Sequence, residues 1–290
     1  MATTRLAVEP LTAPVDAEVR LPGSKSITNR ALLIAALAEG RSLLRGALAS
    51  EDSEVMVDSL RRLGIAVVAE GEDLVVEGRG GEIPTREAEL FVGLAGTAGR
   101  FLTAMVALGR GRYRLDGTAR MRQRPMQPLL DALGALGAQA RSLVGTGSFP
   151  IEVIANGLAG GAARMRGDLS SQFFSALLLV GPLARTGIEL TVEGELVSRP
   201  FVDLTGGVMA EFGATMTHDR YRTMRVAGGQ RYRGREYEIE PDASAAGYFF
   251  AAAALTGGRV TVPGLGRRSL QGDLAFVDLL AEMGCRVERT

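Results

Sequence analysis

The sequence predicts an α/β protein in which one βαβαββ unit recurs four times. Four apolar helical stretches each end in an apolar residue and a glycine, and these glycines (Gly64, Gly137, Gly213 and Gly284) are 73, 76 and 71 residues apart. Alternating segments typical of strands follow, as at 65–68 and 215–217. Small or hydroxyl residues precede the first helix of each unit, at 23–26, 94–97, 168–171 and 242–244. A constant spacing with diverged sequence is typical of a repeated module.

Composition excludes several classes of protein. The 290 residues carry 33 basic and 33 acidic side chains, so the basic field that nucleic-acid binding requires is missing. The single cysteine, Cys285, and single histidine, His218, exclude an internal disulfide and a cysteine- or histidine-rich metal site, and neither residue is expected to act in a site. No apolar run is long enough for a membrane span, and residues 1–20 lack a signal-peptide core. We therefore expect a cytoplasmic protein without metal or membrane association.

The first opening, L-P-G-S-K-S-I-T-N-R, predicts an anion site at the start of a helix. Ser24 or Ser26 is the expected cap and Gly40 the expected end of this helix. A helix N-terminus offers unpaired N–H groups and partial positive charge, to which Lys25 adds a full charge. Arg30 is forked and can hold a carboxylate or phosphate at two points. The alternative from the residues alone is a capped core helix with two solvated cations.

The second opening, G-L-A-G-T-A-G-R, places Gly96 directly before a helix, where a ligand can approach the backbone closely. Simple packing of helix on sheet is the alternative. Farther on, Pro125 forces Arg124 toward an extended conformation. Alternation in an extended segment would put Arg120, Arg122 and Arg124 on one side, where an anion would relieve their repulsion. The alternative for this row of arginines is a solvated edge.

The third opening, G-D-L-S-S-Q, gathers two hydroxyls and an amide at a helix start. Ser170 alone would serve as an N-cap, and that is the alternative reading. Together with Ser171 and Gln172 it supplies more hydrogen-bonding groups than one cap needs. The three residues are therefore candidates for holding an anion.

The first opening and the helix that follows it, A-L-L-I-A-A-L-A, resemble the N-terminal signature of the 5-enolpyruvylshikimate-3-phosphate (EPSP) synthases, or 3-phosphoshikimate 1-carboxyvinyltransferases. Further segments are similar to motifs of this enolpyruvyl transferase family: R-P-M-Q-P-L from Arg124, S-S-Q from Ser170, V-S-R-P-F from Val197, D-A-S from Asp242 and L-Q-G-D from Leu270. The related UDP-N-acetylglucosamine enolpyruvyl transferases are disfavoured, because they would have G-A-K-N near Lys25 and a reactive loop cysteine in the second repeat.

The resemblance implies an architecture. Enolpyruvyl transferases have two similar domains, each of three βαβαββ units around a pseudo-threefold axis. Residues 21–236 would form a complete first domain on the shikimate 3-phosphate side. Residues 1–20, with a strand at about 6–19, and residues 238–290 would form one of the three repeats of a second domain. We therefore expect a chain that is truncated at its C-terminal end relative to the family.

The resemblance also implies roles for individual residues. Lys25 would be the catalytic cation that contacts both substrates and the reaction intermediate, and Arg30 would bind the shikimate carboxylate. Gly96 and Arg124 would contact phosphoenolpyruvate, and Gly96 suggests sensitivity to glyphosate. The substrate-binding residues implied in this way are Lys25, Ser26, Arg30, Gly96, Arg124, Ser170, Ser171, Gln172 and Ser198.

This sequence departs from the family pattern at four positions in two of these segments. Leu94 stands where the family has asparagine, Phe101 where proline is common, Arg199 where lysine is usual and Phe201 where tyrosine is usual. The Asn and Tyr replacements each remove a polar contact, the Phe101 replacement weakens the inference of glyphosate sensitivity, and Arg199 keeps the charge. The fourth repeat, with Asp242 and Asp273, is expected to be structural.

The activity implied is transfer of the enolpyruvyl group of phosphoenolpyruvate to the 5-hydroxyl of shikimate 3-phosphate, with release of phosphate, in the shikimate pathway of aromatic amino acid biosynthesis. The carboxylates for proton transfer would lie in the last two repeats of the family, beyond residue 290. The alternative is a noncatalytic phosphoshikimate-binding module. We expect a monomer acting on these two small molecules, without a cofactor.

Overall fold

The computed structural model describes residue 7 and residues 9–289, and the chain divides into two compact units. The larger unit covers 23–239. The smaller unit comprises the described parts of 1–22 and 240–290. All the predicted site residues lie in the larger unit, which is treated first.

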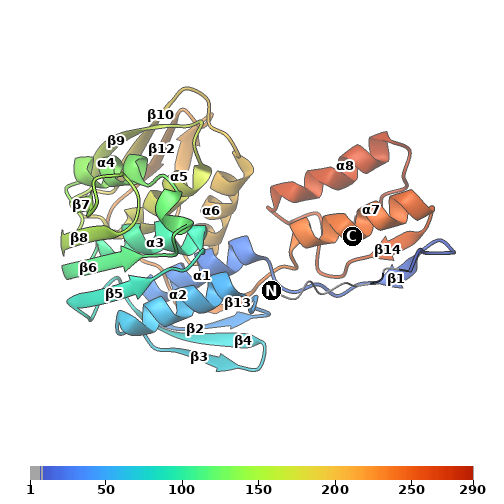
Figure 1. The fold of residues 1–290 in the computed structure, drawn as a ribbon, viewed down its shortest axis with the longest axis horizontal. Coiled ribbons are helices and arrows are strands. Elements are labelled where there is room, and N and C mark those ends of the chain that lie inside the picture. Colours follow the sequence, from blue (N-terminus) through green and yellow to red (C-terminus); the bar gives the residue numbers. More distant parts are fainter. Residues whose placement is uncertain (1–6, 8, 290) are drawn as a thin grey trace. The chain divides into compact units, whose positions relative to one another are not determined.

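Three four-stranded sheets of identical topology build the larger unit (Figure 1). In each sheet one outer strand pairs parallel with its neighbour, and the other two neighbouring pairs are antiparallel. The first sheet has the order β13-β2-β4-β3, with β13 (Glu236–Glu238), β2 (Glu39–Arg45), β4 (Asp73–Arg79) and β3 (Val67–Glu70). The second has the order β5-β6-β8-β7, with β5 (Glu87–Phe91), β6 (Arg110–Asp116), β8 (Ile151–Asn156) and β7 (Gln139–Ser142). The third is β9-β10-β12-β11, with β9 (Gly161–Arg166), β10 (Ile188–Glu193), β12 (Thr223–Val226) and β11 (Thr217–Asp219). The predicted α/β fold of βαβαββ repeats is confirmed.

The first sheet takes its first strand from a distant part of the chain. β13 pairs parallel with β2, so that Tyr237 is opposite Leu44. In the smaller unit β1 (Asp16–Glu18) makes the equivalent parallel pair with β14 (Arg259–Thr261). The predicted strand at about 6–19 is thus shorter, and Leu6 and Val8 lie outside the described residues.

The larger unit has six helices, α1 to α6, which lie between the three sheets (Figure 1). The first helix of each repeat is buried nearly throughout: α1 (Lys25–Leu37), α3 (Gly96–Val106) and α5 (Ser171–Val180). Beyond their first two turns their sequences are almost entirely apolar, which is the pattern of a helix enclosed by protein. The second helix of each repeat is buried on one side: α2 (Glu51–Arg62), α4 (Gln127–Ala135) and α6 (Pro200–Glu211). The core of the unit therefore runs through α1, α3 and α5.

The glycines that revealed the repeat all follow the second helix of their unit. Their φ angles are 86°, 90°, 90° and 97° in chain order, in the left-handed region that favours glycine. Of the helix signals predicted at the first opening, the N-cap position was right and the end was wrong. Ser24 is the N-cap residue, although its side chain makes no capping hydrogen bond, and α1 ends at Leu37, which leaves Gly40 in β2.

The smaller unit holds the two strands named above, α7 (Ala243–Thr256), a 3-10 turn η3 (Gly272–Leu274) and α8 (Ala275–Glu282). Asp242 caps α7 by accepting a hydrogen bond from the Ala245 N–H, as its sequence predicts. Gln271 links the unit internally, because its side chain accepts from the Ala243 N–H and donates to the Pro241 carbonyl. These contacts agree with the structural role predicted for the fourth repeat.

Candidate functional site

The first two turns of α1, α3, α5 and α6 meet in the larger unit. Thr97 of α3 accepts a hydrogen bond from the Gln172 side chain of α5 (3.1 Å). Arg30 extends from α1 to the Ser175 hydroxyl of α5 (3.2 Å) and to the Phe201 carbonyl of α6 (3.3 Å). The N-terminus of a helix carries partial positive charge. Four such ends together make a region that favours an anion.

Arg30 is a buried cation with neutral partners. Its side chain donates to the Thr205 hydroxyl (2.8 Å) and the Ser26 carbonyl (2.8 Å), besides the two contacts above, and the residue is 1% exposed. The rings of Phe101 and Phe201 lie 5.3 and 5.9 Å from the guanidinium carbon. Burial lowers the pKa of Arg30 to about 9. The two phenylalanines that depart from the family pattern thus both contact this cation.

Gly96 and Arg124 are in direct contact. A Cβ at position 96 would fall 2.1 Å from Nη1 of Arg124 and 3.0 Å from Nη1 of Arg100. The absence of a side chain at Gly96 therefore lets two guanidinium groups approach the first residue of α3. Burial, and then the charge of Arg124, lower the pKa of Arg100 to about 10. Two cations therefore lie beside the N-terminus of one helix.

An open hollow of about 470 Å³ lies over this point and is lined by Leu94, Arg120, Gln123, Arg124 and Pro125. Leu94 is exposed here and offers no hydrogen bond, as its sequence predicts. Two arginines supply charge along the wall. The hollow is therefore suited to a small anion that touches one apolar side chain.

The predicted row of three arginines was wrong. Residues Met121–Gln123 form a 3-10 turn, η1, and Arg120 has helical dihedral angles. Only Arg124, which precedes proline, is extended. Arg122 turns to Asp116, with Nε 2.9 Å from a carboxylate oxygen, and does not line the hollow. Pro125 restricts only the residue before it, whereas the conformation of residues 121–123 is set by the hydrogen bonds of the 3-10 turn.

The residues of the third opening lie at the start of α5. Ser170 is the N-cap and accepts from the Gln172 N–H (3.2 Å), so its predicted capping role is confirmed. Ser171 is 4% exposed, whereas Gln172 is half-buried and directed toward α3. Ser198 is exposed just before α6 and has a φ of 56°, a left-handed conformation uncommon for serine. Arg199 beside it pairs with Glu195 (2.9 Å), so its charge already has a partner.

Lys25 is the first residue of α1 and the only lysine in the sequence, since the other 32 basic residues are arginines. Its Nζ lies 3.7 Å from a carboxylate oxygen of Asp52, and its side chain is 52% exposed. An ammonium is a compact point charge that a guanidinium does not reproduce. The one ammonium among the basic side chains thus lies at the start of α1.

Sequence reasoning missed Arg100, Ser175 and Thr205. Ser175 and Thr205 are hydrogen-bonded to each other (2.8 Å) and both bind Arg30. Arg100 binds the Gly96 carbonyl and the Gln172 side chain. One signal was present, because Arg100 is four residues after Gly96 and so lies over the same first turn of the helix.

The two residues expected to have no role lie elsewhere. His218 stacks on Tyr221 (4.2 Å between ring centres) and faces Asp203 at 3.7 Å. Cys285 is a free thiol in the smaller unit. Neither contacts a predicted site residue in the interactions described for the chain.

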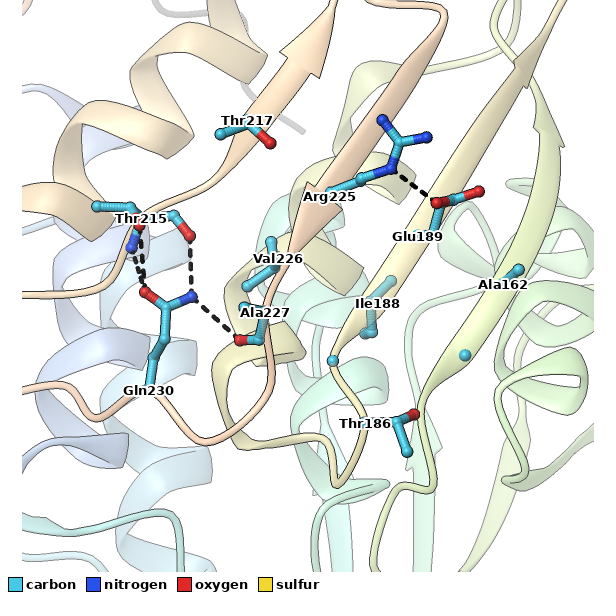
Figure 2. A pocket seen from close by; sticks show the side chains of 12 residues that line it. Ala162, Thr186, Ile188, Glu189, Thr215, Thr217, Arg225, Val226, Ala227 and Gln230 are labelled. Carbon is cyan, nitrogen blue, oxygen red and sulfur yellow. Dashed lines mark hydrogen bonds and ion pairs between the residues drawn. The ribbon is translucent and has the colours of Figure 1, made fainter.

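A larger open groove of about 830 Å³ lies on the third sheet (Figure 2). Its polar groups bind one another: Arg225 pairs with Glu189 (2.7 Å), and Gln230 binds Thr215 and the Ala227 carbonyl. It contains none of the predicted residues. The groove therefore lacks the free charge that the helix starts provide.

Among residues 7 and 9–289 no group of three or more histidine, cysteine, aspartate or glutamate side chains could hold a metal ion. In the same residues no helix is long and apolar enough to span a membrane.

Residues 11–290 are similar to one family. The sequence model of the family described as EPSP synthase (3-phosphoshikimate 1-carboxyvinyltransferase) matches residues 11–290. Relatives with the name 3-phosphoshikimate 1-carboxyvinyltransferase include proteins of Trichormus variabilis (49% identical over 284 residues) and Sulfurovum sp. (45% over 278 residues). The matches cover 97% and 94% of this chain and 67% and 65% of the two relatives. The chain thus spans about two thirds of their length.

The fold is also similar to solved structures. An EPSP synthase of Acinetobacter baumannii superimposes with a TM-score of 0.83, covering 95% of this chain and 61% of that chain at 23% identity. At this identity the likeness concerns the fold alone. It agrees with the sheet topology and repeat described above.

Proposed function

Because the chain belongs to the family of EPSP synthases, the 3-phosphoshikimate 1-carboxyvinyltransferases, we propose that it binds shikimate 3-phosphate and phosphoenolpyruvate. The reaction would transfer the enolpyruvyl group to the 5-hydroxyl of shikimate 3-phosphate and release phosphate, in the shikimate pathway. One observation carries the proposal for this chain. Two buried arginines, Arg30 and Arg100, meet neutral partners at converging helix starts, and Arg124 lies beside them.

The charge of these groups fits the substrates. Both substrates carry a phosphate and a carboxylate, so binding them requires several cations. A buried cation without an anionic partner is costly, and an anion that binds beside it offsets that cost. The pKa values of Arg30 and Arg100 are lowered for the same reason, because burial disfavours the charged form of each side chain. Groups that are held in place before the substrate arrives lose little energy in reorganisation.

The following roles complete the proposal. Lys25 would contact both substrates, and Arg30 the shikimate carboxylate. Gly96 and Arg124 would receive phosphoenolpyruvate in the hollow. The 3-phosphate would be held by Ser170, Ser171, Gln172 and Ser198, and Ser26 would be a further substrate contact. In the transfer, the 5-hydroxyl attacks C2 of phosphoenolpyruvate and gives up its proton while C3 gains one. The tetrahedral intermediate then loses phosphate together with a proton from C3, which restores the double bond.

Proton transfer requires a carboxylate within hydrogen-bond reach of the hydroxyl and of C3. Asp52 is the acidic group nearest to Lys25 in the described contacts, and it forms an ion pair there. We propose that the proton-transfer carboxylates belong to the third of the family length that the match does not cover. This favours one alternative, in which the 290-residue chain binds shikimate 3-phosphate without turning it over.

Calorimetric titration of the purified chain with shikimate 3-phosphate tests the proposal. Replacement of Lys25 or Ser170 by alanine should weaken binding about 10- to 100-fold, since each removes a contact to a charged group. Thr186→Ala, an exposed change on the third sheet, is the matched control and should leave affinity unchanged. A folded chain that takes up no shikimate 3-phosphate would contradict the proposal. Release of phosphate when both substrates are present would distinguish the enzyme from the binding module.

We also propose that the chain acts as a monomer in the cytoplasm. Only small-molecule ligands are required by the roles above, and the described residues include no membrane-spanning helix. Sedimentation velocity of the purified chain measures the first part, and fractionation of the source cells the second.

A further inference from the structure

The guanidinium of Arg100 is enclosed, and one of its nitrogens binds two acceptors. The residue is 6% exposed, and Nη1 donates to the Gly96 carbonyl (3.2 Å) and to Oε1 of Gln172 (2.6 Å). The guanidinium carbon lies 5.0 Å from the centre of the Phe173 ring. Its Nε is buried and has no hydrogen-bond partner among the described residues. The side chain therefore joins the starts of α3 and α5 and has little freedom to move.

This contact makes the two ends of the Gln172 amide unequal. A guanidinium can only donate hydrogen bonds. It therefore binds the amide oxygen, which is an acceptor, and cannot bind the amide NH₂, which is a donor. The nitrogen end is accordingly turned away from Arg100 and donates to the Thr97 hydroxyl (3.1 Å). An amide nitrogen has two N–H groups. One of them serves Thr97, and the second is available to an anion.

We propose that Arg100 is a positioning residue that holds the Gln172 carboxamide with its nitrogen directed to the substrate anion. The inference rests on the proposed function, in which Gln172 binds substrate. Arg100 acts through Gln172 and need not touch the ligand. Without it, the amide could turn over and present its oxygen, which repels an anion.

The charge of Arg100 supports this role. With a pKa of about 10 the guanidinium stays protonated at neutral pH, so that it remains a donor in the working range. The nearby charge of Arg124 opposes this protonated form. A bound anion near the two guanidinium groups offsets their repulsion and so stabilises the protonated form of Arg100. Anion binding and the fixed orientation of Gln172 then favour each other.

A double-mutant cycle tests the mechanism. We expect Arg100→Met to weaken binding of shikimate 3-phosphate, measured by calorimetry of the full chain, about 10-fold or more. In a Gln172→Ala background the same change should alter affinity less than about twofold. Arg100→Lys keeps a donor and should restore part of the affinity. Arg122→Met, whose partner is Asp116, is the matched control. Equal effects of Arg100→Met in both backgrounds would overturn the proposal.

A ligand-free measurement separates this inference from the proposed function. In protein labelled with ¹⁵N-glutamine, the side-chain signals of Gln172 are identified by their loss in Gln172→Ala. In the wild type we expect two sharp, well-separated N–H signals that report a fixed amide. In Arg100→Met these should shift together and broaden, while the other glutamine side-chain signals stay in place. Unchanged Gln172 signals in a folded Arg100→Met chain would overturn the positioning role, even where the wild type binds both substrates. Changed signals in a chain that binds neither substrate would leave the positioning intact and refute the proposed function.

Discussion

The guanidinium of Arg124 occupies the space that a side chain at Gly96 would need. Nη1 of Arg124 would be 2.1 Å from a Cβ at that position, far inside contact distance. Arg124 is exposed and flexible, so it can move away from a methyl group without disturbing the core. The glycine thus determines where the charge of Arg124 lies, and it does so without any hydrogen bond.

Gly96→Ala should therefore separate stability from binding. We expect the free energy of unfolding to change by less than about 1 kcal/mol, because the displaced group is the end of an exposed side chain. Affinity for phosphoenolpyruvate should fall about 10- to 100-fold, since the cation is displaced from the hollow. Denaturant unfolding and calorimetry measure the two quantities. Affinity for shikimate 3-phosphate serves as the internal control, and an equal loss for both ligands would contradict the assignment of Gly96 and Arg124 to phosphoenolpyruvate.

Arg30→Met should stabilise the fold or leave it unchanged, and should abolish binding of shikimate 3-phosphate. The partners of Arg30 keep other contacts: the Thr205 hydroxyl donates to the Phe201 carbonyl (2.7 Å) and lies 2.8 Å from the Ser175 hydroxyl. Replacing a buried charge by an apolar side chain of similar length is often neutral or stabilising by about 1–4 kcal/mol. Affinity should fall at least about 100-fold, because a buried charged contact is lost.

Chemical denaturation and calorimetry of this variant provide the measurement. Arg62→Met is the control, since Arg62 is exposed on α2 and pairs with Asp58 (2.7 Å). Exposed pairs contribute at most about 1 kcal/mol, and no loss of binding is expected there. A loss of several kcal/mol in Arg30→Met would mean that Arg30 holds the four helices together and that its burial needs no substrate to explain it.

Local features made much of the fold predictable from sequence. The glycines at 64, 137, 213 and 284 mark helix ends because the residue after each helix has a left-handed φ, which glycine adopts readily. This requirement is local, so it can be recognised in the sequence. Repetition of that local signal revealed the repeat. The helix starts at 96 and 243 were found in the same way, from small or acidic residues ahead of apolar runs.

What sequence could not predict depends on contacts between distant segments. The pairing of β13 with β2 joins residues that are almost 200 positions apart, and no local pattern signals it. The bond from Arg100 to Gln172 spans 72 positions. The prediction that the arginines at 120–124 lie on one side of an extended segment was wrong for a different reason. Pro125 restricts only Arg124, and the residues before it form a 3-10 turn. Charged side chains could be recognised as candidates, but their partners emerge only from the packed structure.

Binding of shikimate 3-phosphate should weaken as pH rises through 9. Arg30 has a pKa of about 9 in the ligand-free chain, lowered by burial, and an anion favours its protonated form. Affinity should be level from about pH 7 to 8.5 and then fall by up to about tenfold per pH unit. Calorimetry across pH 7–10 gives the profile. In Arg30→Gln the residual affinity should lack the fall centred at 9, and a wild-type profile that stays level to pH 10 would show that Arg30 does not face the ligand.

Lys25 and Asp52 should have opposite effects on anion binding. Lys25 lies 3.7 Å from Asp52, both near the surface, so their ion pair contributes at most about 1 kcal/mol to stability. Lys25→Ala should therefore leave the free energy of unfolding within about 1 kcal/mol of the wild type and reduce affinity for shikimate 3-phosphate about 10- to 100-fold. Asp52→Asn removes a competing negative charge and should raise affinity about two- to fivefold at low salt, with the gain reduced at high salt.

Because Lys25 is the only lysine, reductive ¹³C-methylation gives one side-chain signal besides that of the chain's α-amine. A shift of that signal on titration would report contact directly, and an unshifted signal at saturation would remove Lys25 from the site.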